Sequence, residues 1–184
     1  MANKIKYGLR NVYYAVATEG AGGALTYATP VALPGAVNLT LSQEGETNTF
    51  YADDVAYFQS TSNNGYSGTF EIALIPDAFK TDVLGETADQ NSVLVEKANV
   101  IPKEFALLFE FQGDQNAKRV VLHRCTVSRP DVNGATKEAA IEPQTETLNI
   151  AALPRINDML VKASVEYGQT PYANWFSQVY EPSF

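Results

Sequence analysis

The chain has 184 residues, of which 45% are hydrophobic and 18% charged, a balance that excludes wholesale disorder and suits one domain with a real core. Its net charge of −8 argues against tight binding to nucleic acid, because an acidic surface repels phosphates. The single cysteine, Cys125, excludes an intramolecular disulfide framework and fits a reducing cytoplasm. We also expect no signal peptide and no membrane span, because no apolar run approaches the roughly 20 residues that a span needs.

Two segments in the first part of the chain alternate with a period of two, which predicts β-strands. The first covers residues 12–17. The second, residues 37–42, is predicted to have one dry and one wet face. The dry face would consist of Val37, Leu39 and Leu41, and the wet face of Asn38, Thr40 and Ser42.

A polar and aromatic segment, residues 43–65, follows the second strand. Aromatic residues lie on both sides of Asp53 and Asp54, and Asn64-Gly65 is a dipeptide typical of hairpin turns. Ordered loops of this length in compact domains are usually functional. As neighbours in extended chain, the two aspartates should point to opposite faces, which favours a solvated loop or an inter-subunit contact over a metal site.

The next strand, residues 66–74, has the same two-sided pattern. Its core face is predicted to carry Tyr66, Phe70, Ile72 and Leu74, and its opposite face Ser67, Thr69 and Glu71. Gly68 interrupts the apolar face, which indicates a bulge or a close approach of another backbone.

One helix is predicted, over residues 76–84. Pro76 suits the first turn, Asp77 complements the positive end of the helix dipole, and Gly85 is a natural stop. The packing stripe would consist of Phe79, Val83 and Leu84.

The remaining elements are again strands. A hairpin is predicted from residues 105–112 and 118–128 around the turn 113–116, followed by strands at 144–153 and 161–167. Residues 172–176 form a short aromatic cluster in the last segment, 168–184. This cluster favours docking on the domain or on a neighbour, with a carbohydrate platform as the alternative.

Candidate catalytic groups are few. His123 and Cys125 are two residues apart on a predicted strand and would share a face, but nothing in the sequence activates the thiol. Glu71, Glu110 and Glu146 are typical of the wet face of a sheet and do not form a convincing glycosidase pair. We therefore expect no enzyme activity and no catalytic, metal or cofactor site.

Nine segments, taken in order, resemble the major tail proteins of long-tailed bacteriophages and prophages of Gram-positive hosts, which form the tail tube. They are KIKYGL (4–9), VYYA (12–15), PGAVNL (34–39), FYADD (50–54), NGYSG (64–68), FKTDVLG (79–85), FALLFE (105–110), CTVSRP (125–130) and QTETL (144–148). Each segment is weak alone, but together they span most of the chain.

The resemblance implies a mainly β fold in one domain, 1–184: two packed antiparallel sheets, sandwich- or barrel-like, with one flanking α-helix. It also implies hexameric rings that stack into a tube through which DNA is ejected without specific binding. Partners would be other copies of the chain and the tail-tip or baseplate, tape measure and tail terminator proteins. The protein would be made and assembled in the host cytoplasm and reside in the virion tail.

On this interpretation residues 43–65 form a long hairpin loop that contacts the next ring. Its contact residues would be Glu44, Glu46, Phe50, Tyr51, Asp53, Asp54, Tyr57 and Phe58. The lumen would be lined by Asn38, Thr40, Ser42, Ser67, Thr69 and Glu71. Two alternatives remain: another virion β-sandwich, such as a decoration or baseplate module, and a carbohydrate-binding β-domain.

Overall fold

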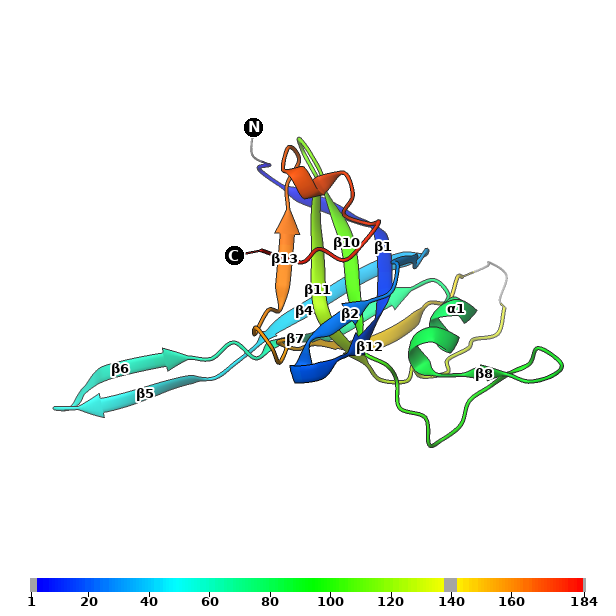
Figure 1. The fold of residues 1–184 in the computed structure, drawn as a ribbon, viewed down its shortest axis with the longest axis horizontal. Coiled ribbons are helices and arrows are strands. Elements are labelled where there is room, and N and C mark those ends of the chain that lie inside the picture. Colours follow the sequence, from blue (N-terminus) through cyan, green and yellow to red (C-terminus); the bar gives the residue numbers. More distant parts are fainter. Residues whose placement is uncertain (1–2, 138–141, 184) are drawn as a thin grey trace.

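The computed structural model describes residues 3–137 and 142–183, and it is mainly β (Figure 1). Most strands belong to one antiparallel sheet of nine strands, in the order β2-β1-β10-β11-β12-β7-β4, with β13 beside β11 and β3 beside β1. Two small sheets, β5-β6 and β8-β9, lie outside it. The strands are β1 (Lys6–Glu19), β2 (Leu25–Tyr27), β3 (Val31–Ala32), β4 (Ala36–Glu44), β5 (Thr47–Ala52), β6 (Val55–Thr61), β7 (Gly65–Ile72), β8 (Thr87–Ala88), β9 (Leu94–Val95), β10 (Phe105–Gly113), β11 (Lys118–Val127), β12 (Glu146–Ala152) and β13 (Lys162–Val165).

The large sheet changes partners along β11. The first half of β11 pairs with β13, and its last three residues, from Cys125 to Val127, pair with β12. One part of the sheet therefore contains β1, β10, β11 and β13, and the other contains β11, β12, β7 and β4. The prediction of a mainly β fold with packed antiparallel sheets is confirmed, and the two parts are continuous through β11.

A β-bulge in β11 accounts for this change of direction. Cys125 pairs with Phe105 and Leu122 with Leu107, so two residues of β11 lie opposite one residue of β10. A bulge bends its strand and increases the local twist. The bend lets the two parts of the sheet turn their apolar faces toward each other.

The main hydrophobic core lies between these two parts. Large buried side chains from both parts meet there, including Phe70, Phe105, Leu107 and Leu148. A second, smaller cluster lies on the other side of β1 and β10 and includes Leu108 and Trp175. Because both faces of β10 are covered, its first six residues are all buried, as in a central strand.

The predicted helix is present as an α-helical turn, α1 (Asp77–Phe79), that continues as a π-helix over Lys80–Leu84. Pro76 precedes it, and Gly85 ends it with a φ of 79°, as expected of a C-terminal glycine. Phe79, Val83 and Leu84 are buried in the main core. Within the described residues, no helix is long and apolar enough to cross a membrane.

Gly68 shows the close backbone approach that its place in the apolar pattern indicated. A Cβ atom at this position would lie 1.9 Å from the carbonyl oxygen of Thr40 on β4. Any larger residue would therefore push β4 and β7 apart.

Two residues assigned to the core face are exposed. Val37 is 51% exposed because the pairing of β4 with β7 shifts between Ala36 and Asn38, and Ala36 packs on the core instead. Leu74 is 67% exposed because β7 ends at Ile72, and Ile75 takes the buried position. A period-two pattern fails at both places because it assumes an uninterrupted strand.

Candidate assembly surfaces

The segment at residues 43–65 forms a long hairpin that projects from the body of the molecule (Figure 1). Within the part of the chain that the structure describes, β5 and β6 pair only with each other, from Thr47 opposite Thr61 to Ala52 opposite Val55. Glu44 is the last residue of β4, and Glu46 lies between β4 and β5. The hairpin is therefore an extension from the ends of β4 and β7.

Asp53 and Asp54 are the two turn residues at the tip of this hairpin. Both have positive φ, 52° and 60°, as a two-residue type I′ turn requires and as aspartate tolerates. They are not in extended chain, so the argument that strand neighbours diverge does not apply, but both are exposed, as a solvated loop requires. The expectation of a hairpin turn at Asn64-Gly65 was wrong, because Gly65 begins β7 and is buried against β12.

One face of the hairpin is apolar and exposed. Phe50 and Phe58 pair across the two strands, and Val55 lies on the same face nearer the tip. Their exposed fractions are 61%, 63% and 58%. Tyr51 and Tyr57 add two more exposed rings near the tip. Exposed apolar surface of this kind is typical of interaction sites.

The second surface is the polar face of β4 and β7. The six residues assigned to it pair across the two strands: Asn38 with Glu71, Thr40 with Thr69, and Ser42 with Ser67. These cross-strand pairs place all six on one face, away from the main core. Thr145 donates a hydrogen bond of 2.6 Å to the carboxylate of Glu71, and Ser67 donates one to Glu44.

β12 and β11 continue this polar face, which the sequence did not indicate. Thr147 pairs with Glu71 and Asn149 with Thr69, so both lie in the same rows. In the next row, Thr126 of β11 pairs with Ala151 of β12, which in turn pairs with Ser67. Polar and apolar residues alternate visibly within residues 144–153. The sequence does not show that this strand pairs with β7, because that pairing joins distant segments.

The C-terminal aromatic segment packs on the body. Trp175 is buried, Phe176 stacks on Tyr13 with ring centroids 4.8 Å apart, and the guanidinium of Arg119 lies 3.8 Å from the centroid of the Tyr172 ring. Arg119 is held in turn by Glu110, which is 1% exposed and also accepts a hydrogen bond of 2.7 Å from Arg10. A buried Trp175 cannot serve as a carbohydrate platform.

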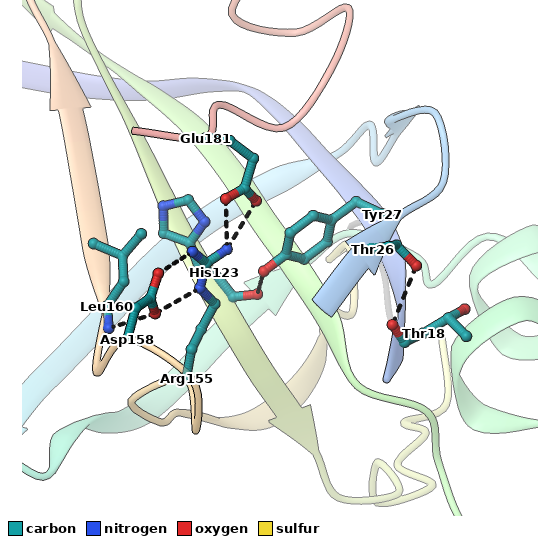
Figure 2. Close-up of polar contacts among 8 residues, drawn as sticks. All are labelled: Thr18, Thr26, Tyr27, His123, Arg155, Asp158, Leu160 and Glu181. Carbon is teal, nitrogen blue, oxygen red and sulfur yellow. Dashed lines mark hydrogen bonds and ion pairs between the residues drawn. The ribbon is translucent and has the colours of Figure 1, made fainter. Parts of the chain in front are cut away.

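His123 and Cys125 do not share a face, in contrast to the expectation from their spacing. The bulge places Cys125 in the main core, where burial raises the pKa of its thiol to about 12. His123 lies on the other side, near Tyr27 and Arg155 (Figure 2). A thiol with this pKa is a poor nucleophile.

Figure 2 shows an ionic cluster that joins the chain terminus to the body. The buried guanidinium of Arg155 donates hydrogen bonds to Glu181 at 2.8 Å and to Asp158 at 3.0 Å. Tyr27 donates its hydroxyl proton to the carbonyl oxygen of His123 at 2.8 Å. Both ring nitrogens of His123 are buried and have no hydrogen-bond partner among the described residues, and burial, with the Arg155 charge, lowers the pKa of His123 to about 4. The residues around this cluster come from four segments that are distant in sequence: β2, β11, the loop at residues 155–158 and the C-terminal segment.

The described residues contain no group of three or more histidine, cysteine, aspartate or glutamate side chains placed to hold a metal ion. Their distinctive features are surfaces: a projecting apolar hairpin and a broad polar sheet face. Of these two, the exposed apolar face of the hairpin is of the kind that marks an interaction site.

The sequence was compared with known proteins and protein families. A search of curated proteins found no match. A family model described as phage tail tube protein matches residues 2–151, which is most of the chain, and confirms the resemblance to major tail proteins. The chain therefore belongs to the phage tail tube protein family, a family of structural proteins of the virion tail.

Proposed function

We propose that the chain, as one tail tube domain, polymerises as stacked hexameric rings into the tube through which phage DNA is ejected. The observation that carries this proposal is the β5-β6 hairpin, which projects from the body with Phe50, Val55 and Phe58 exposed on one face. Exposed apolar surface of this kind marks an interaction site. Contact with the next ring would bury these side chains and order the hairpin.

The polar face of β4, β7, β12 and the end of β11 lines the lumen in this proposal. Six copies of four strands make a barrel of roughly 24 strands, with a backbone diameter of roughly 48 Å at a spacing of about 4.8 Å and a tilt of about 40°. Subtracting inward side chains leaves close to 40 Å, which on this estimate is wide enough for duplex DNA.

The chemistry of this face suits a channel for DNA. It consists mainly of neutral hydroxyl and amide side chains such as Thr40, Thr69 and Asn149, with the carboxylate of Glu71 among them. Neutral groups and carboxylates do not attract phosphates, so DNA would slide without binding. Tail-tip or baseplate, tape measure and terminator proteins would be the further partners, and assembly would take place in the host cytoplasm.

The test is self-assembly of the purified protein. We expect monomers at low concentration by light scattering, and hollow tubes or six-fold rings by negative-stain microscopy when the protein is concentrated or seeded with tail tips. A protein that stays monomeric even when seeded would overturn the proposal. Isolated rings or knobs without tubes would instead favour a decoration or baseplate module.

A further inference from the structure

A groove lies between the edge strand β4 and the strands β10, β11 and β13. It has a volume of about 440 Å³, within the range of roughly 300–1,000 Å³ typical of binding pockets. Its floor is apolar and includes Leu41, Phe109 and Phe111. The two parts of the sheet diverge here, so the groove reaches the edge of the main core, against which these three side chains pack.

Three lysines surround this groove: Lys6, Lys118 and Lys162. Lys6 places its ammonium 4.8 Å from the centroid of the Phe111 ring, and Lys162 lies over Tyr66 in the same way at 4.6 Å. Lys118 makes an exposed ion pair with Glu166. The groove is therefore rimmed by three lysines, one of them paired with Glu166, in a chain whose net charge is −8.

The hairpin has the complementary chemistry. Residues 43–65 contain four acidic residues and no lysine or arginine. Two of the acids, Asp53 and Asp54, form the tip, directly beyond the apolar face made by Phe50 and Phe58. An apolar face with an acidic end therefore matches an apolar floor with a basic rim.

We propose that the lysine-rimmed groove receives the tip of the β5-β6 hairpin from a second copy of this chain. The phenyl rings would enter the groove, and the carboxylates of the turn would lie beside the lysine ammonium groups. A chain cannot fill its own groove in this way, because its hairpin points away from the body and the tip is far from β10 and β13 (Figure 1).

The contact is heterologous, because hairpin and groove are different surfaces of the same chain. Such head-to-tail contacts propagate from copy to copy and leave a free hairpin at one end and a free groove at the other. This inference rests on the proposed tube function and adds to it the receiving site for the hairpin.

Cysteine cross-linking tests the contact in the full-length protein. The variant Asp54→Cys with Lys162→Cys has one thiol at the tip and one at the groove. The native Cys125 does not interfere, because it is fully buried with a raised thiol pKa. After assembly and mild oxidation, we expect a ladder of disulfide-linked oligomers on a non-reducing gel, which collapses to the single chain when dithiothreitol is added.

The matched control is Asp54→Cys with Lys97→Cys. Lys97 is also exposed, but it follows β9, which pairs with β8 on the opposite side of the molecule from the hairpin (Figure 1). We expect no ladder from this control. A second test pair, Asp54→Cys with Lys118→Cys, samples another rim position in case the first substitution prevents assembly.

The outcomes separate this inference from the proposed function. Tubes that form without a ladder from either test pair, or with an equal ladder from the Lys97 control, overturn the groove assignment and leave the tube function standing. A wild-type protein that forms no tubes under any condition overturns both. A ladder specific to the two groove pairs supports the contact.

Discussion

Phe50 of β5 and Phe58 of β6 lie directly opposite each other, and both rings face solvent on one side of a hairpin that pairs with no other strand of the described chain. A cross-strand aromatic pair strengthens a hairpin, but it does not explain why the rings are left exposed in a phage tail tube protein. The proposed contact with another subunit would bury both rings and so account for their exposure in the single chain.

Deleting residues 47–63 should leave a folded monomer that cannot stack. The reason is that β5 and β6 form a separate two-stranded sheet, so the described strand pairs of the large sheet are kept. Circular dichroism and thermal unfolding should match the wild type, while negative-stain microscopy shows no tubes. The double variant Phe50→Ser, Phe58→Ser should behave in the same way with the chain length unchanged. Normal tubes from the deletion variant would rule out the hairpin as the joint between rings.

Replacing Glu71 with lysine should permit tube assembly but slow DNA passage. Glu71 lies on the polar face assigned to the lumen, and the change would add about six cations per ring, which attract the phosphate backbone. The measurement is the rate of DNA ejection from phage particles carrying the variant, followed by a fluorescent DNA dye. Glu19→Lys is the control, since Glu19 is exposed at the end of β1, outside the polar face. An unchanged rate, or side chains at 40, 69 and 71 on the outer surface of a tube, would contradict the lumen assignment.

Replacing Glu110 with glutamine should destabilise the fold at neutral pH. Glu110 is buried and accepts hydrogen bonds from Arg119 and Arg10, so the change removes a charge that compensates two guanidinium groups. We expect a loss of about 2–3 kcal/mol in the free energy of unfolding, less than for a fully buried pair because both arginines reach solvent. Urea unfolding measures this loss. Glu166→Gln is the control, since its partner Lys118 is exposed and the expected change is below about 1 kcal/mol.

The pH dependence of the same variant follows from the pKa of Glu110. Burial raises this pKa, but the hydrogen bonds from Arg119 and Arg10 outweigh burial, so it lies below the ordinary value of 4.5. A carboxyl group whose pKa is lower in the folded than in the unfolded chain stabilises the fold above pH 4.5. This contribution to the free energy of unfolding is lost as the pH falls through the folded-state pKa. Wild type should therefore lose more stability than Glu110→Gln between pH 6 and pH 3. If the free energy of unfolding falls in parallel for wild type and Glu110→Gln between pH 6 and pH 3, the Glu110 carboxylate is not held in its charged form.

His123→Leu should make the fold less sensitive to acid. Burial and the Arg155 charge, only partly offset by Asp158, lower the pKa of His123 to about 4 from 6.5. The unfolded chain therefore takes up a proton first, and wild type should lose about 3 kcal/mol from this group between pH 7 and pH 4. The variant should lack this component and keep that of Glu110. Urea unfolding of wild type and His123→Leu at several pH values measures both contributions. If the free energy of unfolding of the two proteins falls equally with pH below pH 6.5, His123 is not the source of the acid sensitivity.

Patterns along the chain were sufficient for the elements that depend on local chemistry. Alternation predicted most of the strands, and Pro76 and Gly85 marked the helix that carries Phe79 and Val83. The polar rows of β4 and β7 followed from the same alternation, since neighbouring side chains of a strand point to opposite faces. Gly68 in the apolar pattern indicated a bulge or a close backbone approach, and the structure shows the approach and supplies the partner, Thr40.

Long-range pairing decided the rest, because a strand's partner fixes where its register slips and where it ends. The shift at the start of β4 exposes Val37, and the bulge in β11 sends His123 and Cys125 to opposite sides. The groove beside Lys162 is lined by β4 from one part of the sheet and by β10, β11 and β13 from the other, and these parts diverge where β11 changes partners from β13 to β12. These features arise where two distant segments meet, and the sequence of either segment alone does not contain them.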